Sequence, residues 1–376
     1  MLGLYVHVPF CLSKCHYCDF YSLKHSAPAE EAYVSALLQE VALKGQLWGG
    51  SAQTLYFGGG TPSTLGLNSL ALILKAFDRY FPRATASEVT YEVNPGTVQA
   101  GDFVRLRSLG INRISIGLQS HLDSHLHMLG RPHTLADFHS AVQGIKAAGF
   151  DNFSVDALYG LPLQTVSDYL ATLDCLVATG ATHISAYALQ IESGTQFAQL
   201  KEQGRLVPSG EDEVADMMLA GRDFLRARGF VHYEISNFAR PGYESKHNRL
   251  YWQNREYLGF GPSAASFIGR RRFANIADIE GYCHRLKQGM LATASCEKLT
   301  KSLEMAETMI LGLRMLEEGV KRRDFAQRFG PDPLDYYGEQ LAPCVRQGLL
   351  HVDDIALRLT AKGFPLASQV QMAFLL

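Results

Sequence analysis

The sequence predicts an α/β protein, an open (β/α)6 partial barrel of the TIM type followed by a small, mainly helical C-terminal domain. Strand-like and helix-like segments alternate over the first two thirds of the 376 residues, which is typical of a parallel sheet. Polar or glycine-rich motifs follow the predicted strands, where barrel enzymes place their sites. Past residue 230 the alternation stops. Six units are too few for a closed eight-stranded barrel, so we expect a curved, open sheet.

The predicted strands are short and rich in β-branched or aromatic residues. Repeated strand–helix units imply right-handed crossovers between parallel strands. The six strands are expected at Leu4–Val8, Thr54–Phe57, Val89–Val93, Arg113–Gly117, Phe153–Tyr159 and His183–Leu189.

The segments between the strands have helical periodicity. In the first, Tyr33, Leu37 and Val41 share one face, and Pro28 fits the first turn. Further helices are predicted around residues 70–77, 138–145 and 213–228.

The chain is expected to divide into three parts. Residues 1–240 form the core domain, 241–295 a connecting segment and 296–376 an accessory domain. In the accessory domain we expect a helical stretch over Glu297–Phe329, another helix and a short closing segment at Leu349–Leu359. Helices with a little β structure suggest a winged-helix type of domain.

Composition excludes several classes of protein. Hydrophobic residues make up 47% of the chain and charged residues 19%, as in ordinary globular proteins. The net charge of -2 gives no general attraction to nucleic acid. No apolar run approaches the length of a membrane span, and Met1–Phe10 is interpreted as a strand, not a signal peptide. The seven cysteines do not form a disulfide framework, which favours a reducing cytoplasm.

Cys11, Cys15 and Cys18 form a Cys-x3-Cys-x2-Cys run directly after the first predicted strand. Three thiolates at this spacing can hold three irons of a [4Fe–4S] cluster and leave the fourth iron to an external ligand. S-adenosylmethionine (SAM) is the usual occupant, and its reductive cleavage starts radical chemistry. The alternatives are core cysteines or a zinc knuckle, but zinc prefers four ligands at paired spacing and no second Cys-x-x-Cys exists.

Polar motifs end the other predicted strands. A carboxylate can bind the ribose hydroxyls or the amino group of SAM, and an arginine can pair with its carboxylate. Each residue alone could be a solvated loop residue, but their shared placement at strand ends favours a site. These positions are Gly58–Thr61, Glu92, Gln119, Arg131, Asp156 and Gln190.

Two histidine-containing segments remain open to interpretation. His121, His125 and His127 are interpreted as a solvated helix start, because no third metal ligand of the right type is evident. Lys246–Trp252 combines a histidine with flat aromatic side chains, as a porphyrin site would. It could equally be a capped helix start that packs its aromatic residues into a domain seam.

Together these motifs resemble the radical SAM family of proteins like the oxygen-independent coproporphyrinogen III oxidase, over nearly the whole chain. The resemblance implies cluster ligands at Cys11, Cys15 and Cys18. It rests on Tyr5–Cys11, Gly58–Pro62, Glu92–Gly96, Ser115–Ser120, Leu129–Thr134, Tyr159–Pro162 and Leu359–Gly363. The SAM contacts that it implies are Tyr5, Gly59, Gly60, Thr61, Glu92, Gln119, Arg131 and Asp156, with Tyr17, Gln190 and Ala265 as weaker candidates.

Within that family the chain resembles the heme chaperone branch more than the oxidases. The oxidases have a fourth motif cysteine where Phe20 stands, and a longer arm than the ten residues before Cys11. The His-Asn-x-x-Tyr-Trp stretch matches the chaperone branch and implies heme contacts at His247, Tyr251 and Trp252. His121 replaces a usually aromatic residue, and Ala265 stands where the branch commonly has a histidine.

The resemblance therefore implies a cytoplasmic heme chaperone that binds [4Fe–4S], SAM and heme and passes heme to respiratory proteins. No catalytic residue is assigned. The alternatives are SAM-dependent oxidative decarboxylation of coproporphyrinogen III, in porphyrin biosynthesis, and a radical SAM enzyme for another substrate. No transmembrane segment is expected; peripheral membrane contact, the identity of the heme acceptor and a homodimeric state are left open.

Overall fold

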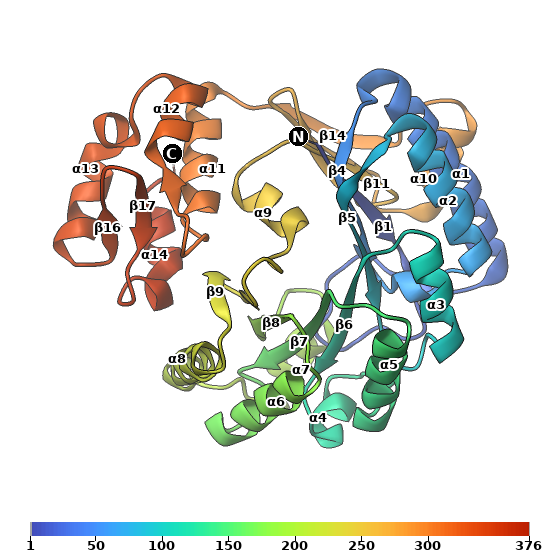
Figure 1. Cartoon of the computed structure of the whole chain (residues 1–376), viewed down its shortest axis with the longest axis horizontal. Coiled ribbons are helices and arrows are strands. Elements are labelled where there is room, and N and C mark those ends of the chain that lie inside the picture. The colour runs from blue at the N-terminus through green and yellow to red at the C-terminus, as the bar shows by residue number, and fades with distance from the viewer. Residues whose placement is uncertain (1, 376) are drawn as a thin grey trace.

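The computed structural model describes residues 2–375, and its frame is a twelve-stranded mixed sheet (Figure 1). Six central strands are mutually parallel and adjacent in chain order, so the prediction of an open parallel core is confirmed. They are β1 (Leu2–Val8), β4 (Ala52–Gly59), β5 (Arg83–Val93), β6 (Arg113–Gln119), β7 (Phe153–Tyr159) and β8 (His183–Ala188). The sheet does not close: β14 (Thr293–Lys298) is one edge and β9 (Val231–Glu234) the other.

Helices cover the outer face of the curved sheet, as Figure 1 shows. The first helix is nucleated locally, because Ser26 Oγ accepts from the Ala29 amide and a proline lies in the first turn. The buried side of this helix includes the predicted Tyr33, Leu37 and Val41. The helices of this region are α1 (Ala27–Trp48), α2 (Leu67–Tyr80), α3 (Ala100–Ser108), α4 (Asp123–Met128), α5 (Leu135–Ala147), α6 (Val166–Ala178), α7 (Gln196–Glu202) and α8 (Glu211–Ala227).

The central strands are buried on both faces, as parallel strands between helices and a filled interior must be. Every residue of β6 is buried. Val6, Leu55, Ile116 and Val155 are fully inaccessible to solvent. Burial of each such side chain contributes about 1.5–3 kcal/mol, so the core fixes where the strand ends, and the motifs that follow them, lie.

Residues 241–295 extend the sheet as well as linking the two ends of the chain. β11 (Tyr257–Phe260) pairs in parallel with β1, on the side opposite β4. Antiparallel β12 (Ala265–Ile268), β13 (Arg271–Asn275) and β14 follow it outward. The segment also contains α9 (Lys246–Trp252) and α10 (Ile279–Lys287). Because its side chains join the main core, we propose a domain boundary near residue 299.

The C-terminal part has a hydrophobic core of its own, which includes Met309, Phe325, Leu357 and Val370. It forms a separate body beside the sheet (Figure 1). Its elements are α11 (Lys301–Gly312), β15 (Val320–Lys321), α12 (Arg322–Phe329), α13 (Pro333–Arg346), β16 (Leu350–Val352), β17 (Ala356–Leu359) and α14 (Ala367–Met372). The three strands form one small antiparallel sheet.

The expectation of one helical stretch over residues 297–329 is wrong. Its first residues belong to β14, and Thr300 then caps α11 by accepting from the Leu303 amide. The stretch breaks again where α11 ends at Gly312, and the following loop contains Gly319, whose φ of 62° favours glycine and whose Cβ, if present, would lie 2.1 Å from the Leu357 carbonyl oxygen.

Smaller elements complete the chain. β2 (Phe10–Cys11) pairs with β3 (Leu23–Lys24), and β10 (Asn237–Ala239) joins β8 to β9. Short 3-10 helices occupy Pro62–Thr64 and Phe364–Leu366. Within residues 2–375, none of the helices combines the length and apolar character needed to cross a bilayer.

Candidate functional site

The three motif cysteines lie together beyond the end of β1. Cys11 closes the short strand β2, and Cys15 and Cys18 lie in the loop that follows; all three are free and partly exposed. The Gly60 amide donates to the Val8 carbonyl at 2.8 Å, and the Thr61 amide donates to the Phe10 carbonyl at 2.7 Å. These bonds dock the glycine loop after β4 onto the cysteine loop.

The glycine run is required by this close approach. A Cβ on Gly59, whose φ is 106°, would lie 2.6 Å from His7 Nδ1. A Cβ on Gly60 would lie 2.7 Å from the Phe10 carbonyl oxygen and 3.1 Å from Cys11 Sγ. Side chains at these positions would fill the space between the strand ends and the thiols.

Two side chains from other loops, Thr61 after β4 and Arg131 after α4, make direct hydrogen bonds to the thiols. Thr61 Oγ1 lies 3.4 Å from Cys11 Sγ, and an Arg131 guanidinium nitrogen lies 3.7 Å from Cys15 Sγ. Arg131 also donates to the Gly117 carbonyl at 2.9 Å. Its buried Nε has no partner among the described residues, and could serve a ligand carboxylate.

Two carboxylates, Glu92 on β5 and Asp156 on β7, face the same region from the two sides of β6. Burial raises the pKa of Glu92 to about 7, although the Tyr56 hydroxyl, which donates to Glu92 at 2.6 Å, acts to lower it. Burial also raises the pKa of Asp156, and the two carboxyls disfavour each other's charge. Such a pair is suited to a ligand that brings a positive charge or hydroxyl groups, as SAM does.

Three of the remaining predicted contacts lie around this centre, and the two weaker candidates Gln190 and Ala265 stay predictions. Gln119 has a positive φ of 78° at the end of β6, and Tyr5 stacks on Tyr56 with a centroid distance of 6.2 Å. Tyr17 packs against Phe197, and burial raises the pKa of its hydroxyl. Gln190 is exposed beyond β8 and Ala265 is exposed at the start of β12; no hydrogen bond joins the side chain of either to the other predicted contacts.

The donor set fits a cluster better than a single ion. Within residues 2–375, no three His, Cys, Asp or Glu side chains converge closely enough for one metal ion. A cubane spreads three thiolates over three different irons, and Cys11, Cys15 and Cys18 supply three thiols from one short loop. His121 Nδ1 instead bonds Thr172 and His125 Nδ1 bonds Ser120.

Helix α9 places His247 inside the curved sheet. Glu88 accepts from the Lys246 and His247 amides, each at 3.0 Å, and so satisfies the start of the helix. The His247 side chain is 1% exposed. Its Nδ1 lies 2.7 Å from Thr54 Oγ1 and its Nε2 2.8 Å from the Tyr251 hydroxyl. Burial, and then the charge of Arg113, lowers its pKa to about 3, so the ring is neutral.

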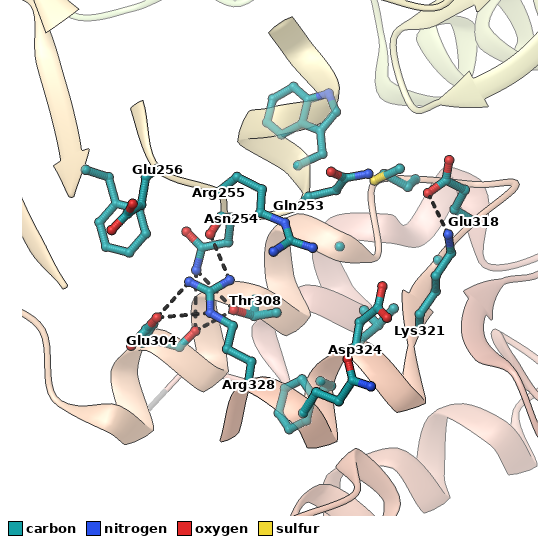
Figure 2. Close-up of a pocket in the computed structure, with 18 of the residues that line it drawn as sticks. Gln253, Asn254, Arg255, Glu256, Glu304, Thr308, Glu318, Lys321, Asp324 and Arg328 are labelled. Atoms are coloured by element: carbon teal, nitrogen blue, oxygen red, sulfur yellow. Dashed lines mark hydrogen bonds and ion pairs between the residues drawn. The ribbon is translucent and has the colours of Figure 1, made fainter. Parts of the chain in front are cut away.

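The other two residues of the predicted heme motif have different surroundings, and only Trp252 lines the seam between the domains. Tyr251 packs edge-on against Tyr257, with centroids 4.6 Å apart. Trp252 lines a cavity of about 530 Å³ between the core and the C-terminal domain (Figure 2). The Arg314 guanidinium lies 4.2 Å from the centre of the Trp252 ring.

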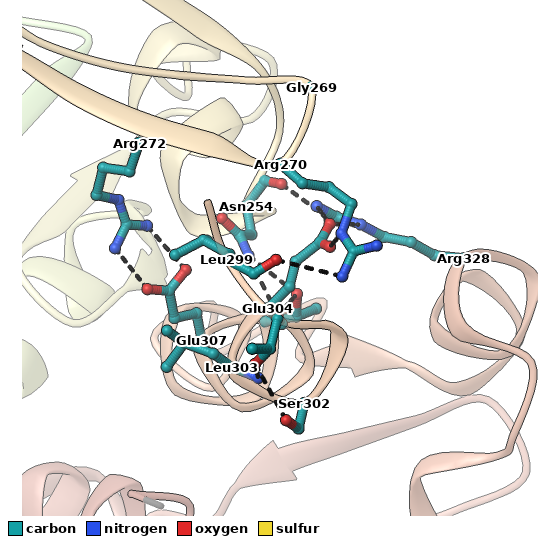
Figure 3. A network of polar contacts seen from close by, with 12 residues as sticks. Asn254, Gly269, Arg270, Arg272, Leu299, Ser302, Leu303, Glu304, Glu307 and Arg328 are labelled. Carbon is teal, nitrogen blue, oxygen red and sulfur yellow. Dashed lines mark hydrogen bonds and ion pairs between the residues drawn. The ribbon is translucent and has the colours of Figure 1, made fainter. Parts of the chain in front are cut away.

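Ion pairs fix one side of this cavity. Glu304 binds Arg328 at 2.7 Å and Arg270 at 2.9 Å (Figure 3). Arg328 also donates to the Asn254 carbonyl at 2.8 Å, and the Asn254 amide group donates to Thr308 at 3.0 Å. The seam that contains Trp252 is therefore held by bonds between the two domains.

Comparison with known proteins agrees with this geometry. The Radical SAM superfamily model matches residues 5–176, and the HemN C-terminal domain model matches 299–366. The heme chaperone HemW of Lactococcus lactis is 34% identical over 99% of this chain and 97% of its own. The chain belongs to the radical SAM superfamily, in the HemW family. The heme chaperone HemW of Bacillus subtilis is 33% identical over 100% of this chain and 99% of its own.

A solved structure extends the match to the fold. Coproporphyrinogen III oxidase (HemN) of Escherichia coli superposes with a TM-score of 0.86 at 24% identity, covering 99% of this chain and 89% of that one. Membership of the radical SAM superfamily implies SAM and a [4Fe–4S] cluster. The cysteine loop, the glycine run and the strand-end carboxyls fit both groups.

Three residues of the site have no assigned role in the sequence pattern. Tyr56 and Thr54 are alternate residues of β4 that face the interior, and Asn94 follows β5 within the Glu92–Gly96 motif. A hydroxyl in a buried strand is the signal that could have indicated Thr54 and Tyr56, and the motif itself is the signal that could have indicated Asn94.

Proposed function

We propose that this protein is a cytoplasmic heme chaperone that binds a [4Fe–4S] cluster, SAM and heme, and delivers heme to respiratory acceptor proteins. The observation that carries the proposal is similarity to HemW heme chaperones along the full length of both chains. The His-Asn-x-x-Tyr-Trp segment, on α9, supports it, because this helix lies between the SAM-facing strands and the domain seam.

In this proposal Cys11, Cys15 and Cys18 hold the cluster. When bound, the cluster and SAM supply one-electron chemistry at the SAM sulfonium. The chain's own groups bind and orient the nucleotide. Glu92 and Asp156 accept from its hydroxyl or ammonium groups, Arg131 pairs with its carboxylate, and Gly59 and Gly60 leave room for it. Thr61, Gln119, Tyr5 and Tyr17 complete the walls of the site.

The proposed heme contacts are His247, Tyr251 and Trp252, and their roles differ. Trp252 offers a flat face in a cavity whose volume lies within the range of about 300–1,000 Å³ common to ligand sites. His247 is neutral, as an axial ligand must be, but both ring nitrogens have protein partners. Coordination by His247 therefore requires the bond to Tyr251 or to Thr54 to be exchanged for the iron.

Hemin titration of anaerobically reconstituted protein tests this proposal. Binding should give a Soret band, His247→Ala should shift or weaken it, and Trp252→Ala should lower affinity without changing the ligand field. Iron–sulfur content should stay unchanged in both. Trp48→Ala is the matched control, because Trp48 is the only other tryptophan and stacks on Phe273 away from α9.

The rival function is SAM-dependent decarboxylation of coproporphyrinogen III, and the same preparation tests it. The chaperone proposal expects hemin binding without release of 5′-deoxyadenosine in step with substrate loss. Stoichiometric decarboxylation by the wild-type protein would overturn it. Exposed Phe20, 60% accessible beside the cysteine loop, offers no thiolate where the oxidases have one.

A further inference from the structure

A continuous chain of hydrogen bonds joins two of the cluster cysteines. From Cys15 Sγ it runs to the Arg131 guanidinium at 3.7 Å, and from the other guanidinium arm to Asn94 Oδ1 at 3.0 Å. Asn94 Nδ2 then donates to Thr61 Oγ1 at 2.9 Å, and Thr61 Oγ1 donates to Cys11 Sγ at 3.4 Å. Three side chains, from the loops after α4, β5 and β4, thus join both thiols in one network.

Asn94 gives this chain its direction. A guanidinium can only donate, so the side-chain oxygen of Asn94 must face Arg131 and the side-chain NH2 group must face Thr61. The Thr61 oxygen then accepts from Asn94, and its single proton is directed to Cys11. Every donor along the path points away from the cationic guanidinium, so both sulfurs receive the positive end of a bond.

The Asn94 backbone is held in place independently of its side chain. Its amide donates to Ser63 Oγ at 3.2 Å, and its carbonyl oxygen accepts from Thr97 Oγ1 at 2.6 Å. Removal of the side-chain amide would therefore leave the loop anchored and break only the chain between the thiols.

We propose that Asn94 is a positioning residue that sets the hydrogen bonds to Cys11 and Cys15 and thereby raises the reduction potential of the cluster. This inference rests on the proposed assignment of the cluster to these cysteines. Hydrogen bonds to the sulfurs stabilise the more negative, reduced state. Residues that bond the ligands commonly tune a metal site in this way. Loss of Asn94 should make reduction harder.

Potentiometric titration of the reconstituted protein, followed by electron paramagnetic resonance, tests the inference. Asn94→Ala should keep the iron content of the wild type and shift the midpoint potential to a more negative value. Thr61→Val, which removes only the hydroxyl bonded to Cys11, should shift it in the same direction. Thr61→Ser keeps the hydroxyl and should restore the wild-type potential.

Thr90→Val is the matched control, because it makes the same hydroxyl-to-methyl change in β5 at a buried hydroxyl that has no hydrogen-bond partner among the described residues. It should leave the potential unchanged. Wild-type potentials in both Asn94→Ala and Thr61→Val, or an equal shift in Thr90→Val, would overturn the inference. Loss of the cluster from both variants would also overturn it, since the hydrogen-bond network would then be needed for cluster assembly. Absence of a cluster from the wild-type protein would instead reject the cysteine assignment itself.

Discussion

The hydroxyl of Tyr56 donates a hydrogen bond to Glu92 at 2.6 Å. The ring of the same tyrosine stacks on His247, with centroids 5.0 Å apart and planes 25° apart. Tyr56 therefore touches both a proposed SAM carboxyl and the proposed heme histidine from inside the sheet. Because both contacts are direct, a substitution on α9 and a substitution at the strand ends should each change the surroundings of Tyr56.

Tyr56→Phe should weaken SAM binding near neutral pH. Burial is the largest influence on the pKa of Glu92, and the tyrosine bond opposes it. Without that bond the pKa should rise above its present value of about 7, and more of the carboxyl would be neutral. A hydrogen bond to a charged group is worth about 1.5–3 kcal/mol, so calorimetry should show weaker binding that recovers as the pH is raised. An equal loss of SAM affinity at every pH would show that the loss does not come from the ionisation of Glu92. Tyr80→Phe serves as the control.

The unfolding free energy of the cluster-free protein should depend on pH through the ionisation of Glu92. Its folded pKa of about 7 exceeds the ordinary value of 4.5, so between these values the unfolded chain binds fewer protons than the native one. The contribution of Glu92 is thus fully present below pH 4.5 and is lost as the pH rises through about 7. In urea unfolding, Glu92→Gln should gain stability relative to the wild type across this window. A pH-independent difference would show that Glu92 ionises normally.

Cluster assembly should depend on the clustered cysteines alone. Cys11→Ala, Cys15→Ala and Cys18→Ala should each abolish the visible iron–sulfur absorption, since a cubane with only two thiolates is poorly held. Cys175→Ala and Cys344→Ala should keep about four irons per chain. A full cluster in Cys15→Ala would remove this loop from the assignment.

Asp156→Ala and Arg131→Ala should each cost about 1–3 kcal/mol of SAM binding, the loss expected when a charged partner is removed. The iron content should survive both changes, because neither residue is a thiolate. Unchanged SAM affinity in both variants, measured by calorimetry, would place SAM elsewhere.

The central sheet could be predicted from sequence because its strands are local runs of β-branched residues between turn signals. β7 was predicted over its observed residues, and the other five overlap their predictions, although β5 begins at Arg83 and not at the predicted Val89. The strand-end motifs followed from topology, since parallel strands bring their carboxyl ends to one edge. The helical stretch at 297–329 failed because caps and a positive-φ glycine outweigh hydrophobic periodicity.

The surroundings of His247 could not be predicted in this way. Thr54, which bonds its Nδ1, lies 193 positions earlier in the chain. The pairing of β11 with β1 likewise joins residues more than 250 positions apart. Such contacts depend on tertiary packing and leave no local pattern, so a histidine that is buried and doubly bonded has the same sequence signature as an exposed ligand.

The last prediction concerns a buried ion pair within α1, between residues four positions apart. Lys44 Nζ lies 2.6 Å from Glu40 Oε1, and neither side chain is exposed. Glu40 also accepts from the Gly261 amide at 2.8 Å and from the Tyr282 hydroxyl at 2.7 Å, so the pair ties α1 to the segment that follows β11 and to α10. Lys44→Met should leave an uncompensated buried carboxylate and cost about 3–5 kcal/mol of unfolding free energy.

Two further variants distinguish a buried-charge effect from lost packing. The double variant Glu40→Gln/Lys44→Met removes both charges and should lose less than Lys44→Met alone, because no ion is left without a partner. Arg222→Met breaks an ion pair with Asp223, whose side chain is 66% exposed, and should cost about 0–1 kcal/mol. Urea unfolding of all three measures the difference. A double variant less stable than Lys44→Met would contradict the buried-charge explanation. It would mean that the Glu40 carboxylate stabilises the fold through its hydrogen bonds with Gly261 and Tyr282, which Glu40→Gln weakens.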